Sequence, residues 1–366
     1  MKILHINSYY STSNFYKNLY DSQKEHGLNI DVYVFVSTSD DVSKLKLGNY
    51  TTISKNHGKY DRYIFHLKHL KILSDIQTKF DIRKYSILHA HSLFSNGYIA
   101  YKLKQKYNTP YIVAVRNTDV NLFFKKIFYL RKTGINILRN AEKIMFLSEP
   151  YKKETIDKLI PYKYKKEIAD KSIVIPNGID KYWLENKLKE RIIPNDNRIG
   201  LVYAGQINDN KNIETTIKAC ELLMEQGYDI TYKIIGKIMD KRYIDIIKGY
   251  SFIEYIPYCR KEKLINHYRN SDIFIMPSEH ETFGLVYAEA MSQGLPVIYS
   301  RGQGFDGQFE DGLVGYSVQY NSPEEIAKKV IVIINNYESI SQNCINKVDK
   351  FNWNKIADKY IEIYKG

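Results

Sequence analysis

Short apolar runs alternate along this chain with longer segments whose apolar positions have helical spacing. Several of the runs are almost continuously apolar, which is typical of strands that are covered on both faces. Helical segments such as 96–107 separate them. The pattern therefore predicts parallel βαβ units and an α/β fold class. In the first half the apolar runs lie at 2–8, 30–36, 86–92, 110–116, 143–149 and 172–176.

The alternation pauses once, at a polar segment that ends in the turn cluster Pro-Asn-Asp-Asn, and it then resumes. A chain of 366 residues is long enough for two domains. We therefore predict two doubly wound, Rossmann-like domains, with a ligand at the carboxyl ends of their strands. Further apolar runs lie at 199–205, 230–236, 252–257, 272–278 and 296–300, with a helical pattern at 352–364. The expected bounds are 1–180 for the N-terminal domain, 181–198 for a linker, 199–350 for the C-terminal domain and 351–366 for a tail helix.

Composition limits the class of protein more than it identifies a partner. The net charge of +13 suits polyanions, such as nucleic acid, anionic lipid headgroups or phosphorylated small molecules. The 33 tyrosines, with abundant lysine, isoleucine and asparagine, are equally typical of AT-rich coding. The three cysteines are far apart, which argues against a disulfide scaffold and favours a reducing compartment. Without a signal peptide or a run of about 18 apolar residues, the sequence predicts a soluble, cytoplasmic protein.

Segment 281–289 holds two glutamates on either side of an aromatic residue, a glycine and an apolar run. A helix is expected from Gly284 onward, and a helix N-terminus suits a phosphate group. Eight residues of helix span about 12 Å, whereas carboxylates that share glycoside chemistry lie about 5–9.5 Å apart. The spacing favours two groups that hold the ends of one extended ligand. The alternative is a helix N-terminal charge at Glu281 and a solvated side chain at Glu289.

Other polar residues follow predicted strands. Lys211 lies between the strand and the helix of 203–220, where it would either neutralise a diphosphate or face solvent. Arg116 and Asp119 follow the strand at 110–116, either inside a binding cleft or as a local ion pair or cap.

His89 and His91 share one face of a predicted strand and could bind a metal or act as a general base. No third ligand is evident, and alternation along a strand end explains the pair as well. We therefore predict no metal site.

Segment 122–143 mixes aromatic and aliphatic residues with six lysines or arginines. It would form either a basic amphipathic face that touches a membrane or a basic helix packed on its own domain. No Walker A loop, GxSxG elbow, HExxH or GxGxxG fingerprint is present.

Taken together, these motifs resemble the retaining GT-B glycosyltransferases of family 4, the glycosyl transferases group 1. The strongest match is 271–300, which looks like the family's Glu-x7-Glu donor signature. Weaker matches lie at 174–180, 203–212, 252–272 and 352–364. The resemblance implies a GT-B fold, with two Rossmann-like domains facing across a cleft and a C-terminal helix that crosses back to the N-terminal domain.

The resemblance also implies roles for individual residues. Glu281 would bind hydroxyls of the donor sugar and Glu289 the ribose of the nucleotide. Catalysis would be positioning plus stabilisation of the leaving diphosphate, with no bound metal and a nucleotide sugar as co-substrate. The expected catalytic residues are Lys211, Glu281 and Arg116; the donor-binding residues are Gln206, Ile256, Tyr258, Thr282, Phe283, Gly284, Leu285 and Glu289; the acceptor-side residues are His91, Asn117 and Asp119.

Three positions depart from the family pattern. Gln206 stands where the family usually has an arginine, and Arg116 stands where it often has a histidine. Residues 9–14 replace a glycine-rich turn. We hypothesise that Arg116 reaches the donor diphosphate and compensates for Gln206.

The expected activity is transfer from a nucleotide sugar, most simply a UDP-sugar, to a glycan or lipid-linked acceptor in cell-envelope polysaccharide or glycoconjugate synthesis. Peripheral contact with an anionic membrane at its inner face is an accompanying hypothesis, and nucleic acid is not an expected partner. One alternative is a catalytically inactive nucleotide-sugar-binding partner of another glycosyltransferase. A second alternative, an NAD(P)-linked dehydrogenase, is opposed by the missing GxGxxG.

Overall fold

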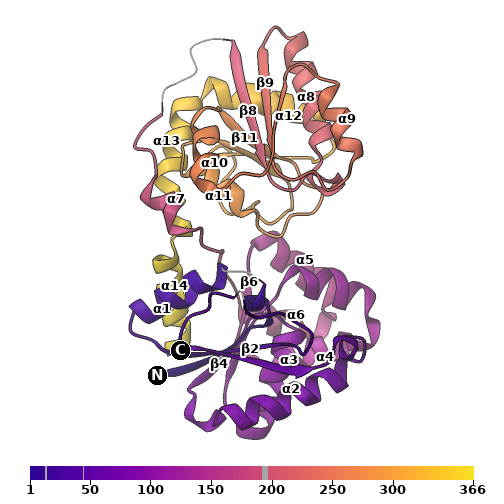
Figure 1. Ribbon diagram of the computed structural model, residues 1–366, viewed down its shortest axis with the longest axis vertical. Helices are drawn as coiled ribbons and strands as arrows, with labels where there is room; N and C mark the ends of the chain where they lie inside the picture. The colour runs from indigo at the N-terminus through magenta and orange to yellow at the C-terminus, as the bar shows by residue number, and fades with distance from the viewer. Residues whose placement is uncertain (13–14, 44, 192–196) are drawn as a thin grey trace. The chain divides into compact units, whose positions relative to one another are not determined.

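The computed structural model describes residues 1–12, 15–43, 45–191 and 197–366, and these residues form two compact units (Figure 1). Each unit contains a parallel sheet flanked by helices, which confirms the predicted α/β fold class. The N-terminal unit consists of Met1–Leu147, Tyr151–Pro176 and Trp353–Gly366, and the C-terminal unit of Ser148–Pro150 and Asn177–Asn352.

Within the described residues, the sheet of the N-terminal unit has seven parallel strands in the order β3-β2-β1-β4-β5-β6-β7. The order reverses between β1 and β4, whose register pairs His5 with His89. Its strands are β1 (Lys2–Ile6), β2 (Asn29–Ser37), β3 (Thr51–His57), β4 (Ile87–Ala90), β5 (Tyr111–Ala114), β6 (Lys143–Phe146) and β7 (Ser172–Val174).

Helices cover both faces of this sheet because successive strand residues point to opposite sides. Leu4 and Ile6 of β1 belong to one core, under α2 to α6, whereas Ile3 belongs to the other, under α1 and α14. The helices are α1 (Phe15–Glu25), α2 (Phe65–Lys79), α3 (Ser95–Tyr107), α4 (Arg131–Asn140), α5 (Glu149–Leu159), α6 (Tyr162–Asp170) and α14 (Trp353–Lys365). Shorter turns are η1 (Ser8–Ser11), η2 (Lys59–Tyr63), η3 (Ile82–Lys84), the π-helix η4 (Asp119–Phe124) and η5 (Phe128–Leu130).

The C-terminal unit repeats this topology, with six parallel strands among its described residues in the order β10-β9-β8-β11-β12-β13. Its strands are β8 (Arg198–Ala204), β9 (Asp229–Ile235), β10 (Ile253–Ile256), β11 (Ile273–Met276), β12 (Val297–Ser300) and β13 (Gly315–Val318). Its helices are α7 (Lys181–Glu185), α8 (Ile213–Glu225), α9 (Arg242–Lys248), α10 (Lys261–Arg269), α11 (Leu285–Met291), α12 (Pro323–Asn335) and α13 (Tyr337–Lys347), with the short turns η6 (Asp209–Lys211) and η7 (Val348–Phe351).

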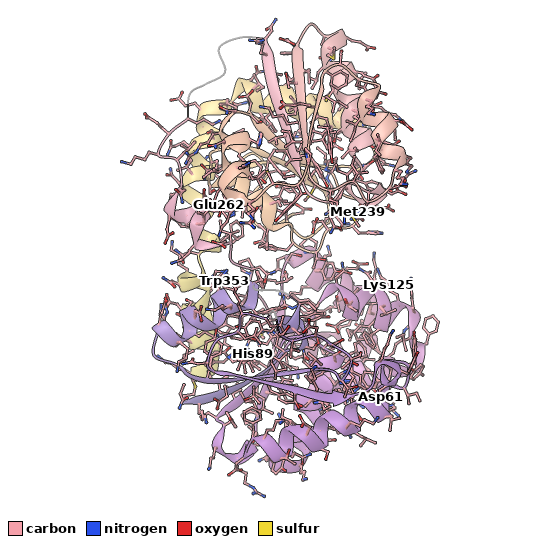
Figure 2. All side chains as sticks on the ribbon, viewed as in Figure 1. Asp61, His89, Lys125, Met239, Glu262 and Trp353 are labelled. Atoms are coloured by element: carbon pink, nitrogen blue, oxygen red, sulfur yellow. The ribbon has the colours of Figure 1, made fainter. Side chains whose placement is uncertain are left out.

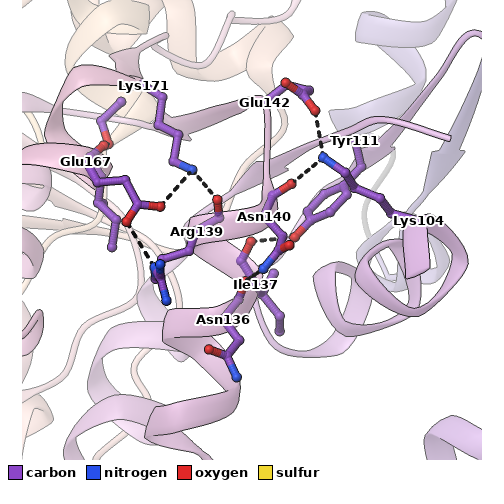
Figure 3. A network of polar contacts seen from close by, with 11 residues as sticks. Lys104, Tyr111, Asn136, Ile137, Arg139, Asn140, Glu142, Glu167 and Lys171 are labelled. Carbon is purple, nitrogen blue, oxygen red and sulfur yellow. Dashed lines mark hydrogen bonds and ion pairs between the residues drawn. The ribbon is translucent and has the colours of Figure 1, made fainter. Parts of the chain in front are cut away.

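Lysine side chains hold the end of α4 in the N-terminal unit (Figure 3). Lys104 Nζ donates to the carbonyl oxygen of Asn140 (2.8 Å) and to Glu142 Oε1 (2.7 Å). Lys171 Nζ donates to the carbonyl oxygen of Arg139. The last turn of a helix leaves carbonyl groups without intrahelical partners and carries a partial negative charge, so two ammonium groups stabilise it there.

Two edge strands, β3 and β13, were not predicted from the apolar pattern. β3 pairs with β2 alone and has the mostly polar sequence TTISKNH, and β13 pairs with β12 alone. β13 is only four residues long, with the sequence GYSV, so neither strand carries the continuous apolar run by which the other strands were predicted.

Much of segment 181–198, predicted as a linker, is held within the C-terminal unit. Trp183 of α7 is buried, and the guanidinium of Arg191 donates to the carbonyl oxygens of Gln293 (2.8 Å) and Tyr268 (3.3 Å). The main segment of this unit starts at Asn177, before the predicted linker. Residues 192–196, which include the turn cluster of the predicted linker, lie outside the described residues.

The C-terminal helix α14 belongs to the N-terminal unit, which confirms the predicted return of the chain. Its residues Ile356, Tyr360 and Tyr364 lie in the same core as Leu19 and Tyr20 of α1. None of the helices that the structure describes has the length and apolar character required of a transmembrane segment.

Candidate functional site

The carboxyl ends of β8 and β11 lie side by side in the C-terminal sheet, at the point where the strand order reverses. Ligands of doubly wound folds bind at this position. Asn210, in the loop after β8, donates to the His280 carbonyl oxygen (2.9 Å) and accepts from the His280 N–H (3.0 Å). These bonds join the two loops and bring Lys211 beside Glu281, which is 70 positions further along the chain.

Lys211 and Glu281 form a short ion pair, with Lys211 Nζ 2.5 Å from Glu281 Oε2. The two side chains are only 19% and 13% exposed, so the pair is screened less than an ordinary surface ion pair. The other oxygen, Oε1, accepts from the backbone N–H of Thr282 (3.0 Å) and lies 3.4 Å from that of Phe283. The structure thus brings together two of the three predicted catalytic residues, as a fixed cation next to a hydrogen-bonding carboxylate.

Gly284 makes the turn from this loop into α11. Its φ of +74° lies in the left-handed region, and a Cβ there would come within 2.4 Å of the Tyr287 ring. Phe283 is buried, and its ring centroid lies 5.7 Å from that of Phe351. Leu285 is the first residue of α11. The backbone of 283–285 is therefore held in one conformation, while the binding of a diphosphate there stays a prediction.

Gln303, in the loop after β12, is a residue that the sequence reasoning missed. Its side-chain oxygen accepts from the backbone N–H of Glu281 (2.9 Å), and the next residue, Gly304, donates to the Glu281 carbonyl oxygen (2.8 Å). Gln303 could have been predicted from its position, because it closely follows β12, the strand that pairs with β11.

The C-terminal unit also contains a pocket of about 1110 Å³, a size suited to a nucleotide or a similar ligand. Its floor depends on the close approach of two loops: a Cβ on Gly236, whose φ is +147°, would lie 1.8 Å from the carbonyl oxygen of Gly205. The lining includes the predicted residues Gln206, Tyr258 and Glu289, the hydrophobic side chains Ile244, Ile247, Tyr255, Pro257 and Val286, and the charged side chains Asp180, Lys237, Lys248 and Lys261.

Glu289 projects into this pocket from α11. Its pKa is raised to about 7, first by burial and second by the nearby carboxylate of Asp180. A hydrogen bond from Trp183 and the charge of Lys261, which pairs with Asp180 at 2.6 Å, act in the opposite direction. Near neutral pH, the carboxyl of Glu289 is therefore poised to ionise when a ligand donates hydrogen bonds to it.

The structure gives the two glutamates of segment 281–289 different partners: Glu281 pairs with Lys211, and Glu289 faces Asp180, Trp183 and Lys261. Asp180, Trp183 and Lys261 were not predicted as site residues, because they come from two elements far from 281–289 in sequence. Ile256 does not line the pocket; its carbonyl oxygen accepts from the Gly236 N–H (2.9 Å), and its neighbours Tyr255 and Pro257 form the wall instead.

The remaining predicted residues lie in the N-terminal unit, after β4 and β5. Asp119 is buried, and its carboxylate accepts from the backbone N–H groups of Leu93 (2.9 Å), Phe94 (3.0 Å) and Arg116 (2.9 Å). This is the cap alternative that the sequence left open. Burial raises the pKa of Asp119 to about 6, against these three hydrogen bonds. Asn117 accepts from the side-chain amide of Asn121.

The side chain of Arg116 is held by other residues of the N-terminal unit. Its Nε donates to the carbonyl oxygen of His91 (3.1 Å), and the guanidinium lies near the hydroxyl groups of Tyr9 and Tyr16. Tyr9 belongs to segment 9–14, the replacement for the glycine-rich turn, of which residues 13–14 lie outside the described residues. The acceptor-side roles of His91, Asn117 and Asp119, and the action of Arg116 on a diphosphate, stay predictions.

His89 and His91 have a third histidine beside them, which sequence reasoning missed. His5 of β1 pairs in register with His89, and all three side chains are buried (Figure 2 labels His89). His5 Nδ1 lies 3.0 Å from His91 Nε2, and His89 Nδ1 lies 2.6 Å from the Tyr364 hydroxyl. His5 could have been predicted only from knowing that β1 and β4 are neighbours in the sheet.

These rings form a hydrogen-bonded stack. The ligand atoms of the three histidines lie within 4.8 Å of one another, a separation that a metal ion could bridge. The rings of His89 and His91, however, are stacked at 4.0 Å with an interplanar angle of 19°, so their in-plane lone pairs run nearly parallel and do not converge on one ion. We assign the cluster to packing and hydrogen bonding.

We expect this cluster to make the N-terminal unit sensitive to acid. Burial lowers the pKa of His5 to about 3 and those of His89 and His91 well below 6.5. The unfolded chain therefore takes up protons below pH 6.5 that the folded chain excludes, so the free energy of unfolding is highest above that pH and decreases as the pH falls. Each histidine contributes about 2 kcal/mol to this decrease by about pH 5.

The measurement is urea unfolding at about pH 7.5 and pH 5 in a Trp183→Phe background, where Trp353 of the N-terminal unit is the sole tryptophan. His89→Asn should reduce the difference between the two pH values by about 2 kcal/mol, whereas the exposed His66→Asn should leave it unchanged. An equal pH dependence in the His89→Asn variant would contradict the assignment.

Two family models together match most of the chain. The model described as Glycosyltransferase Family 4 matches residues 14–182, and the model described as Glycosyl transferases group 1 matches residues 185–351.

Curated proteins and solved structures give consistent matches. The chain is 26% identical over 313 residues to an uncharacterised glycosyltransferase of Methanocaldococcus jannaschii, a match that covers 82% of this chain and 83% of the relative. It is 26% identical over 277 residues to the alpha-monoglucosyldiacylglycerol synthase of Acholeplasma laidlawii, covering 70% of this chain and 68% of the relative. Anabaena HepE in complex with UDP has a TM-score of 0.73 at 15% identity, with all of both chains covered. At that identity the structural match shows the fold alone.

Proposed function

Because the chain belongs to the group 1 glycosyltransferases of family 4 and has their GT-B fold, we propose that it transfers a sugar from a UDP-sugar to a glycan or lipid-linked acceptor, with retention of anomeric configuration. The observation that carries this proposal is the C-terminal site: Glu289 of the short helix α11 lines a nucleotide-sized pocket, and Glu281 of the Lys211–Glu281 pair lies in the loop just before that helix.

The donor is proposed to bind along this helix and the loop before it. The ribose hydroxyls donate to Glu289, and the base rests between the pocket wall at Tyr255–Tyr258 and the side chains of α9. The lysines of the pocket, Lys237, Lys248 and Lys261, make it suitable for an anionic nucleotide. A uracil base is supported by the solved relative whose complexes contain UDP and UDP-glucose.

The reaction itself is proposed to need a positioned cation more than a protein nucleophile. The leaving diphosphate gains negative charge as the glycosidic bond breaks, and Lys211 Nζ balances that charge without a bound metal. Glu281 accepts hydrogen bonds from sugar hydroxyls, and its ion pair keeps the ammonium in place. The acceptor hydroxyl attacks on the face that the diphosphate leaves, which retains the configuration.

The acceptor is proposed to be a glycan or a lipid-linked sugar of the cell envelope. One curated relative is named for glucosyl transfer to a lipid, and another, at 29% identity over half of this chain, for capsular polysaccharide biosynthesis in Staphylococcus aureus.

The donor site is tested by titration calorimetry with UDP, GDP and ADP. We expect UDP to bind, and Glu289→Ala to weaken it by about 10- to 100-fold, the loss of hydrogen bonds to one charged group. Because ribose hydroxyls would lower the raised pKa of Glu289, binding near pH 7 should release protons, seen as a heat that depends on the buffer. The release should disappear in Glu289→Gln.

The control is Glu262→Ala, an exposed carboxylate at the start of α10, which should bind UDP normally. Turnover is assayed by NMR with a panel of UDP-sugars, whose product linkage should keep the donor's anomeric configuration. An inverted linkage would contradict the retaining mechanism. Tight UDP-sugar binding with neither transfer nor slow hydrolysis would instead favour the inactive binding partner, for which Gln206 in place of arginine is the specific observation.

A further inference from the structure

Large hydrophobic side chains are exposed mainly on two segments of the N-terminal unit. Eight of the ten such residues in the described part of that unit lie there, and only Met1 and Tyr162 lie elsewhere. Scattered exposed hydrophobic residues are normal, but a group of this size marks an interaction site. The group consists of Tyr60, Tyr63, Ile64, Leu67, Leu70, Leu122, Phe128 and Tyr129. We call segments 59–70 and 122–132 together the aromatic–basic surface.

The two segments are neighbours. The rings of Phe65 and Phe123 lie 6.1 Å apart, and both residues pack into the core below. Figure 2 shows the labelled residues Asp61 and Lys125 on the same side of the N-terminal unit. The exposed side chains are therefore held on one folded base, with Tyr60 76%, Tyr129 69% and Phe128 63% exposed.

The charge on this surface is mainly positive. Segment 120–141 contains no acidic residue, and Asp61 is paired with Lys71 at 2.6 Å. Arg131 stacks on the Phe128 ring at 4.3 Å. Among the residues that the structure describes, Lys126 and Lys132 are exposed and have no ion pair.

A partner that binds this surface must match both its exposed aromatic rings and its positive charge. Exposed tyrosine and phenylalanine beside lysines fit the boundary between anionic headgroups and acyl chains, where rings enter the apolar layer and ammonium groups stay with phosphate. The surface also continues from the end of β5, since η4 begins at Asp119, whose carboxylate is bonded to the backbone of Arg116.

We propose that the aromatic–basic surface docks this chain on a bilayer that contains anionic phospholipid, next to the predicted acceptor-side residues. The inference deepens the proposed function, on which it rests, because a docked enzyme meets a lipid-linked acceptor where that acceptor resides. The structure identifies the residues that would bind the bilayer. The aromatic rings of 122–132 enter the boundary between headgroups and acyl chains, and the lysines beside them contact the anionic headgroups.

Cosedimentation with vesicles tests the proposal, using the full chain without any donor. We expect binding to phosphatidylcholine vesicles that contain one third phosphatidylglycerol, little binding to phosphatidylcholine alone, and release by high salt. Lys126→Gln with Lys132→Gln should weaken binding by about twenty-fold, since each lysine near an anionic surface contributes roughly a factor of five. Phe128→Ser with Tyr129→Ser should weaken it at least as much. The matched control, Lys328→Gln with Lys347→Gln, removes the same charge from exposed positions of the C-terminal unit and should change binding less than two-fold through the altered net charge.

Three results would overturn the proposal: no binding to anionic vesicles, equal loss in the control and test variants, or self-association in ultracentrifugation that Phe128→Ser with Tyr129→Ser abolishes. UDP affinity, measured on the same variants, keeps this test separate from the proposed function. Variants that bind UDP normally but no longer bind vesicles would support membrane docking by the aromatic–basic surface. Absence of UDP binding in the wild type would contradict the proposed donor site and would leave the docking proposal unaffected.

Discussion

Lys211→Met is expected to lower kcat by about 10²- to 10³-fold, the usual cost of removing one fixed group that stabilises transition-state charge. Methionine keeps the aliphatic stem and removes only the ammonium, so packing around η6 should be preserved. Affinity for UDP should fall much less, because the charge on the diphosphate grows as the bond breaks. Single-turnover kinetics and UDP calorimetry on the same protein separate these two effects.

Lys218→Met is the matched control for that variant. It removes an exposed lysine from α8, seven residues further along, and should leave turnover unchanged. A double variant, Lys211→Met with Glu281→Gln, distinguishes the catalytic role from a purely structural ion pair. If the pair only stabilises the fold, the double variant should recover the activity that Lys211→Met loses; we expect it to remain inactive.

Arg116→Ala should also reduce kcat by about 10²-fold or more, while UDP binding to the C-terminal unit largely survives. The reason is that Gln206 leaves that unit without the arginine of the family pattern, and Arg116 is the extra cation of the N-terminal unit. Arg139→Ala, which removes an exposed arginine from the same unit, should have no such effect. Stopped assays with saturating UDP-sugar provide the measurement.

Gln206→Arg tests whether Arg116 compensates for the missing arginine. In the Arg116→Ala background it should restore part of the lost turnover, whereas in the wild type it should change little. Near-normal turnover of Arg116→Ala alone would refute the hypothesis. A loss of thermal stability without rescue would instead assign Arg116 to its hydrogen bond with the His91 carbonyl oxygen.

A site residue could be predicted only where a local sequence pattern marks its position. The loop 281–284 and Lys211 were predicted because each lies at a strand-to-helix turn, and turns after parallel strands face the binding edge. Trp183 was not, since α7 sits in a segment whose polar composition indicated a linker. Asp180 and Lys261 were not, since only the tertiary structure brings their parts of the chain beside Glu289. The buried indole and the bonds of Arg191 overrule that composition.

The histidines also divide into two that a local pattern placed together and one that it did not. Alternation along β4 predicted that His89 and His91 share a face, and this holds as a stack of two rings. The partner on β1 could not be found from that pattern, because His5 is 84 positions away from His89 and meets it only through strand order. Strands β3 and β13 were missed because the mostly polar sequence TTISKNH and the short sequence GYSV lack the apolar run that marks a central parallel strand.

The sequence by itself determined the alternation of buried strands and helices, the two-fold repeat of that alternation, and the position of the Glu-x7-Glu segment at a strand-to-helix turn. These are local properties, because burial on both faces imposes an apolar run wherever a central parallel strand occurs. The tertiary structure alone decided which turns meet: the reversal of strand order places Lys211 against Glu281 and seats Glu289 among Asp180, Trp183 and Lys261. Crossover connections set those neighbours, and no periodicity along the chain encodes the choice.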